Sequence, residues 1–160
     1  MIRFLKIAIP VFIVGFVAGN AFWYLASPLW IDREVNETLP AEFMATALKE
    51  GRFRDADLAH KGEGRAQIMR SAAGTALVRL TEFTVTNGPD LEVWLVKAPD
   101  PQSSDDVKQS EWISLGPLKG NKGDQTYLVP DGTDIDAYGS VVIWCEQFGV
   151  LFSPATLTEV

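Results

Sequence analysis

One cysteine and one histidine are the side chains best suited to redox or metal chemistry in this 160-residue sequence. Cys145 lies in an apolar run, residues 141–145, whose β-branched and aromatic residues predict a strand. Alternation along that strand places Cys145 on one face with Val141 and Ile143. Two interpretations stay open for Cys145. It is either a small, inert core residue, or a redox or ligand thiol close to a strand end.

The cysteine count itself excludes several classes of protein. A single thiol cannot form an intramolecular disulfide, a CxxC redox pair or a zinc finger. It also cannot hold an iron–sulfur cluster ligated by cysteines of one chain. His60 lies in a glycine-rich segment, residues 60–64, which predicts a loop and a solvated imidazole. His60 becomes a cofactor or metal neighbour only if the fold brings it close to Cys145 or to a carboxylate.

Three carboxylates, Asp131, Asp134 and Asp136, fall within six residues. Oxygen ligands at such spacing suit Ca²⁺, although the order is not that of a twelve-residue EF-hand loop. Turn chemistry explains the same segment, because Asp and the neighbouring Gly132 favour turns. We therefore keep a weak calcium hypothesis beside the interpretation as a turn.

Sequence signatures of known catalytic sites are absent. The chain has no GxSxG elbow, HExxH helix, P-loop or dinucleotide fingerprint. A single histidine also leaves little room for a Ser/His or Cys/His mechanism. The sequence favours a role other than catalysis and leaves any cofactor unknown.

An uncharged segment, residues 7–26, precedes all of these residues and predicts a membrane-spanning helix, since about 20 apolar residues cross a bilayer. Arg3 and Lys6 come before it and acidic residues follow it, which predicts a cytoplasmic N-terminus and an extracytoplasmic domain. Trp23 and Tyr24 at its far end suit an uncleaved signal-anchor. The alternative is a cleavable signal peptide with its cut near Gly19, and both interpretations export the domain.

The exported part predicts an all-β fold. Residues 1–30 form the anchor, residues 31–51 a linker and a short amphipathic helix from Thr38 to Gly51, and residues 52–160 a β domain. In that helix Phe43, Ala47 and Leu48 make one apolar side. Strands are predicted at residues 66–69, 75–80, 91–96, 112–115, 125–129, 140–145 and 148–152, with residues 98–110 as a polar loop. About seven short strands separated by turns indicate an antiparallel sandwich or small barrel.

Charge divides the chain as sharply as hydropathy does. Two of the 14 Lys and Arg residues and none of the 21 acidic residues precede residue 31, so residues 31–160 carry a net charge of −9 (12 − 21). Such a surface repels phosphate backbones, so nucleic acid is excluded as a partner. Cations and basic protein surfaces are the partners that it attracts.

Motifs in the exported part resemble the DM-thirteen domain family over about residues 52–157. The first half of the resemblance rests on HKGEG at residues 60–64, LTEF at 80–83, NGPDL at 87–91 and VWL at 93–95. The second half rests on LGPLKGNKGDQTY at residues 115–127, YGSVVIWC at 138–145, FGVLF at 148–152 and Ala155.

The resemblance implies a β-rich extracellular domain, often found beside DOMON-type domains, with a role in electron transfer in which Cys145 is the redox-active group. We therefore expect a membrane-anchored electron-transfer or thiol-presenting domain that acts with a redox partner. The alternatives are a non-catalytic binding module and a structural subunit of an envelope complex.

Overall fold

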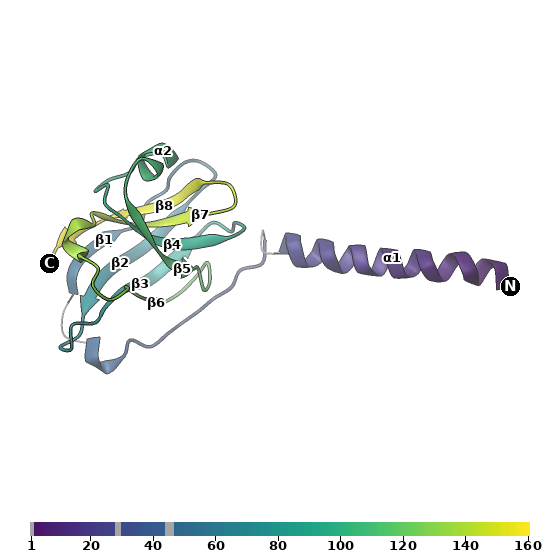
Figure 1. Cartoon of the computed structure of the whole chain (residues 1–160), viewed down its shortest axis with the longest axis horizontal. Coiled ribbons are helices and arrows are strands. Elements are labelled where there is room, and N and C mark those ends of the chain that lie inside the picture. The colour runs from purple at the N-terminus through teal and green to yellow at the C-terminus, as the bar shows by residue number, and fades with distance from the viewer. Residues whose placement is uncertain (1, 28–29, 44–46) are drawn as a thin grey trace. The chain divides into compact units, whose positions relative to one another are not determined.

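The computed structural model describes residues 2–27, 30–43 and 47–160. Contacts divide the chain into two units, Met1–Ile31 and Asp32–Val160, which are described separately here. The first unit contains helix α1, Ile2–Ala26, with Pro10 inside it (Figure 1). Within α1 the segment Phe4–Tyr24 has a mean hydropathy of 1.9 and is long and apolar enough to cross a membrane.

Asn20 is a polar residue within the apolar helix α1. The side chain of Asn20 donates from Nδ2 to the carbonyl of Phe16 at 2.7 Å, so its amide is satisfied within the helix. At the C-terminal end the indole of Trp23 lies edge-on to that of Trp30, with ring centroids 6.2 Å apart. Such aromatic side chains are typical of a membrane–water interface.

The second unit is a sandwich of two antiparallel sheets. The strands are β1 (Ala47–Arg52), β2 (Gly62–Arg70), β3 (Ala76–Val85), β4 (Leu91–Val96), β5 (Trp112–Pro117), β6 (Gln125–Leu128), β7 (Ser140–Cys145), β8 (Val150–Thr156) and β9 (Thr158–Glu159). One sheet has the order β6-β3-β2-β1-β9 and the other β5-β4-β7-β8. This architecture confirms the predicted all-β fold and selects the sandwich over the barrel.

The main core lies between the two sheets because one face of each strand is apolar. The inward side chains from the central strands are Ala66, Ile68, Val78, Leu80, Val93, Leu95, Val141, Ile143 and Cys145. All nine are fully buried. The opposite face of β4 and β7 carries a second cluster that includes Trp94, Val142 and Trp144. The alternation predicted for residues 141–145 is therefore confirmed.

The helix predicted from Thr38 to Gly51 is not formed as predicted. A 3-10 turn, η2, spans only Ala41–Phe43, and residues 47–52 form strand β1, which pairs with β2. Residues 44–46 lie outside the described residues. Phe43 is buried against Met69 and Leu77 on the outer face of the first sheet, whereas Leu48 packs on the main core. This part of the chain is thus stabilised by strand pairing and by burial on both faces of the first sheet, and not by the single apolar face of a helix.

Two short helical elements connect strands on the second sheet's side. The predicted polar loop at residues 98–110 contains helix α2, Ser104–Lys108. A capping box starts α2: the Ser103 side chain accepts from the backbone of Asp106, whose carboxylate accepts from the backbone of Ser103. Val107 is the buried residue of α2 and packs in the second cluster. A 3-10 turn, η3, spans Ile135–Ala137.

Candidate functional site

Cys145 ends strand β7, and its thiol is covered. Its relative exposure is 0%, although the turn that follows, residues 146–148, is exposed. The thiol donates from Sγ to the carbonyl oxygen of Pro89 at 3.0 Å. Pro89 belongs to the connection between β3 and β4. The sulfur is thus one residue away from a solvent-exposed turn but has no direct access to it.

The surroundings of the sulfur favour its protonated form. Burial raises the pKa of the Cys145 thiol, because a thiolate is poorly solvated there. Backbone N–H groups of Phe148 and Gln147 oppose this shift, and the nearby carboxylates of Asp90 and Glu146 reinforce it. The net direction is upward, so Cys145 is a shielded thiol and not an activated thiolate.

His60 is paired with a carboxylate, not with the thiol. Its Nδ1 lies 2.7 Å from Oδ2 of Asp57, and Oδ1 of Asp57 accepts from the backbone of His60 at 2.8 Å. The His60 side chain lowers the pKa of Asp57 to about 2, with further help from the backbone N–H groups of His60 and Ala59. On its other side the imidazole packs against Phe152, with ring centroids 4.3 Å apart.

Phe152 joins the surroundings of His60 to those of Cys145. The ring of Phe152 lies in the main core with Cys145 and also lies so close to Gly88 that a Cβ atom there would be 2.6 Å from it. Gly88 directly precedes Pro89, the acceptor of the thiol hydrogen bond. Phe152 contacts His60, and the loop that Phe152 touches at Gly88 continues to the acceptor of the thiol. His60 bonds to Asp57 and the thiol to Pro89, so His60 does not serve as the thiol's base.

The segment with Asp131, Asp134 and Asp136 uses its backbone oxygens for an internal cation. The buried ammonium of Lys49 donates to the carbonyls of Ile135, Asp136 and Tyr138 at 3.1–3.3 Å. Within the described residues, no group of three or more His, Cys, Asp or Glu side chains is placed to hold a metal ion. Calcium binding by the three aspartates stays a prediction without geometric support.

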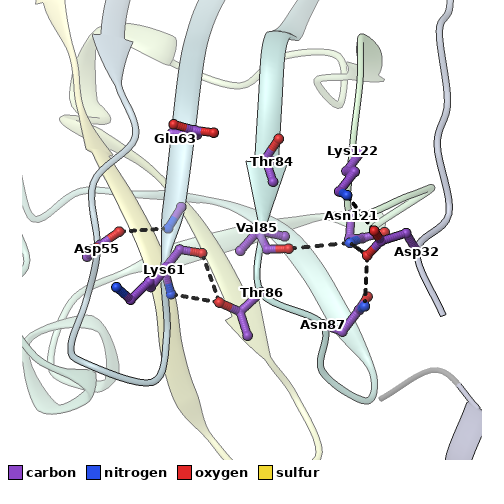
Figure 2. Close-up of a pocket in the computed structure, with 11 residues that line it drawn as sticks. Asp32, Asp55, Lys61, Glu63, Thr84, Val85, Thr86, Asn87, Asn121 and Lys122 are labelled. Atoms are coloured by element: carbon purple, nitrogen blue, oxygen red, sulfur yellow. Dashed lines mark hydrogen bonds and ion pairs between the residues drawn. The ribbon is translucent and has the colours of Figure 1, made fainter. Parts of the chain in front are cut away.

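A polar cleft that the sequence analysis did not predict opens beside β2 and β3 (Figure 2). Its volume is about 450 Å³, and its lining includes Asp32, Asp55, Lys61, Glu63, Thr84, Thr86, Asn87, Asn121 and Lys122. The cleft joins Asp32, from the predicted linker, with residues of the predicted loop at 60–64 and with residues from distant parts of the β domain. Only the chain's tertiary pairing brings them together.

Asp32 organises one wall of this polar cleft (Figure 2). Its carboxylate accepts from the side chains of Asn87 at 3.1 Å and Asn121 at 2.8 Å, and it forms an ion pair with Lys122. The bond from Lys122 lowers the pKa of Asp32 most, followed by that from Asn121. The cleft thus presents carboxylate, amide and ammonium groups, which are suited to binding a polar ligand.

Comparison with known proteins gives one match. A family model described as "Electron transfer DM13" matches residues 52–157. No curated protein and no solved structure matches the chain.

Proposed function

Because the chain belongs to the DM13 electron-transfer family, we propose that it is a membrane-anchored electron-transfer domain on the extracytoplasmic side of its membrane. The observation that carries the proposal is the extent of the family match. Residues 52–157 include every strand from β2 to β8 and therefore the sole cysteine. Its redox partner is a separate protein whose surface suits an acidic domain.

The anchor in this proposal is α1, retained as an uncleaved helix. Its length, its apolar composition and the paired indoles of Trp23 and Trp30 support retention. Orientation follows from charge, since Arg3 and Lys6 lie at the N-terminal end of α1 and Asp32 is the first acidic residue after it. Positive residues remain in the cytoplasm, which places the β-sandwich outside.

In this proposal Cys145 is the redox group. Its burial favours electron transfer over thiol–disulfide exchange. A covered, protonated sulfur is poorly placed for attack on a disulfide, which needs an accessible thiolate. Electron exchange without bond formation suits it better. One electron leaves the sulfur for a metal-centred acceptor in the partner, and the thiol proton leaves to solvent beside the turn at residues 146–149. Reduction reverses both transfers.

Voltammetry of the full chain in lipid nanodiscs tests this role. We expect a one-electron wave in the wild type that is lost in Cys145→Ser and in Cys145→Ala, while any oxidation of aromatic side chains is the same in all three proteins. Ser140→Ala is the matched control, because Ser140 lies at the other end of β7, is fully buried and also donates to a backbone carbonyl, that of Ala98 at 2.7 Å. A wave that persists without Cys145, or is absent from the wild type, rejects Cys145 as the redox group.

The polar cleft favours a second function, recognition of a small polar ligand without catalysis. Its volume of about 450 Å³ accommodates such a ligand. Thermal-shift measurements on the full chain with a panel of zwitterionic amino acids and dicarboxylates test it. A stabilising ligand whose effect is lost in Lys61→Gln and kept in Lys108→Gln, outside the cleft, supports binding. No shift with any member of the panel counts against it.

A further inference from the structure

Three tryptophans from three neighbouring strands stack on the outer face of the second sheet. Trp94 of β4 lies parallel to Trp112 of β5, with ring centroids 3.8 Å apart and planes 10° apart. Trp144 of β7 stacks on Trp94 at 5.0 Å and 28°. Trp94 and Trp144 are each 3% exposed, whereas Trp112 is 43% exposed. The stack therefore forms a continuous path of π-systems from the interior to solvent.

Charged groups lie unevenly along this path. The indole of Trp94 donates from Nε1 to Oε2 of Glu92 at 2.7 Å, and the same oxygen accepts from Oγ of Ser114 at 2.7 Å. At the inner end, the ammonium of Lys108 lies 5.9 Å from the ring centroid of Trp144. A positive charge on an oxidised indole is stabilised by a carboxylate and destabilised by an ammonium group. Trp94 is thus easier to oxidise than Trp144.

The inner end of the stack adjoins the redox candidate. Trp144 directly precedes Cys145, so their Cα atoms are about 3.8 Å apart although the side chains occupy opposite faces of the sheet. Packing alone accounts for the burial of Trp94 and Trp144. It does not account for a carboxylate on the N–H of a buried indole, or for a third ring stacked in parallel at the surface.

We propose that Trp94 and Trp112 form an electron relay between the interior of the sandwich and a docked redox partner, with Glu92 as the proton acceptor. This inference rests on the proposed electron-transfer function. A metal-centred one-electron acceptor at the surface takes an electron from Trp112, and Trp94 then transfers an electron to the oxidised Trp112. The oxidised Trp94 passes its Nε1 proton to the Glu92 carboxylate and becomes a neutral radical. The Cys145 thiol, the redox group of the proposed function, then gives the electron that reduces Trp94 and releases its own proton to solvent, and Glu92 returns the proton to Nε1.

Flash-quench oxidation with ruthenium tris-bipyridine tests the relay. The full chain in nanodiscs carries Trp23→Phe and Trp30→Phe, so that only the three stacked indoles contribute to the signal. In this background we expect rapid formation of a neutral tryptophan radical. Glu92→Gln keeps an acceptor for the indole N–H but cannot take its proton. We expect a radical cation that persists at least tenfold longer in this variant.

Position-specific variants complete the test. Trp112→Phe removes the surface ring and slows oxidation of the interior at least tenfold, while Ile113→Val, a neighbouring change on β5, leaves the rate unchanged. An unaltered radical in Glu92→Gln, or an unaltered rate in Trp112→Phe, overturns the relay. Radical transfer without a Cys145 voltammetric wave supports the relay and rejects only the role of Cys145. A voltammetric wave from Cys145, together with unchanged radical kinetics in both Glu92→Gln and Trp112→Phe, rejects the relay but not the role of Cys145.

Discussion

The thiol of Cys145 donates its hydrogen bond to a backbone carbonyl oxygen and not to a side-chain base. Thiol chemistry in proteins depends on the thiolate, whose formation needs solvent, a cation or N–H donors. Here two backbone N–H groups stabilise the thiolate, but burial outweighs them and raises the pKa of Cys145. Cys145 therefore lies close to the surface, but its surroundings do not activate the thiol.

Alkylation of Cys145 measures this shielding. We expect iodoacetamide to modify the native full chain at least tenfold more slowly than the denatured chain at both pH 7 and pH 9. A higher pH speeds both reactions by raising the thiolate fraction, but the native thiol stays behind because its pKa is raised and its surface is covered. Native reactivity equal to that of the denatured chain would show that the connection around Pro89 opens freely.

The pair of Asp57 and His60 predicts a specific dependence on acidity. The pKa of Asp57 is lowered from 3.8 to about 2 in the folded chain. A depressed carboxyl pKa contributes stability above the unfolded value, and that stability is lost as pH falls through the folded one. The melting-temperature difference between wild type and Asp57→Asn should therefore shrink between pH 4 and pH 2.

Periodicity predicted the position of Cys145 correctly because alternation depends only on neighbouring residues. It placed Cys145, Val141 and Ile143 on one face, and all three are in the main core. The partners of His60 and Cys145 were not predictable in this way. Asp57 reaches His60 through a local turn, and Pro89 reaches the thiol from 56 residues away. The first contact depends on the shape of a turn and the second on tertiary packing, and alternation along one strand encodes neither.

Strands β2 and β3 pair across an irregularity centred on Gly64. The register shifts between Glu63 and Arg65, and Gly64 has a φ of +105°, which favours glycine. A Cβ atom at Gly64 would lie 2.7 Å from the Cα atom of Phe83 and from a backbone oxygen. We expect Gly64→Ala to lower the free energy of unfolding by more than about 2 kcal/mol.

Gly74 provides the control for this effect. It also has a positive φ, +91°, but a Cβ atom there would have no neighbour within 4 Å. Gly74→Ala should therefore cost only the backbone strain, about 1 kcal/mol. Chemical denaturation of both variants gives the comparison, and equal losses would show that the close approach at Gly64 relaxes without cost.

The predicted linker is attached to the β-sandwich through Glu37. Its carboxylate accepts from the backbone N–H and the hydroxyl of Thr126, at 2.8 and 2.5 Å, and from the ammonium of Lys119 at 2.7 Å. Burial alone would raise the pKa of Glu37, but these bonds outweigh it and lower the pKa. The segment before β1 therefore contributes directly to the stability of the β unit.

Removing the Glu37 carboxylate tests this attachment. We expect Glu37→Ala to reduce the free energy of unfolding by about 1–3 kcal/mol, because it leaves partly buried donors of Thr126 and Lys119 unpaired. Glu34→Ala is the control, since the Glu34 side chain is exposed and bonds only to Asn36 next to it. Denaturant titration of both variants decides, and equal stability would mean that residues 32–37 act only as a tether.

Strand and helix predictions succeeded where local patterns were strong. The ranges predicted for β4 and β7 agree with the structure residue for residue. Residues 47–51 were wrongly assigned to a helix, because Ala, Leu, Lys and Glu favour helices when considered alone. In the structure their backbone pairs with β2 and β9, and Lys49 is buried against the carbonyls near η3. Long-range pairing overrode local propensity.

The acidic charge of residues 31–160 is a property of the molecule as a whole. A net charge of −9 over residues 31–160 attracts basic partner surfaces and speeds their encounter at low salt. The distribution of charge also predicts the side of the membrane, because the only charged residues before the uncharged segment 7–26 are the basic Arg3 and Lys6. Electron transfer with an extracytoplasmic partner requires that the sandwich be exported.

Fusion of alkaline phosphatase after Val160 measures the sidedness directly, since this enzyme is active only where its disulfides form. We expect full phosphatase activity in cells, and little activity after Arg3→Glu and Lys6→Glu remove the positive flank. Lys61→Glu and Lys108→Glu change as many charges within the β unit, far along the chain from the membrane segment, and should leave activity unchanged. An inactive wild-type fusion, with a fluorescent protein at the same position folding in the cytoplasm, would reverse the orientation. The sandwich would then face a reducing compartment, and the extracytoplasmic electron-transfer role would be rejected.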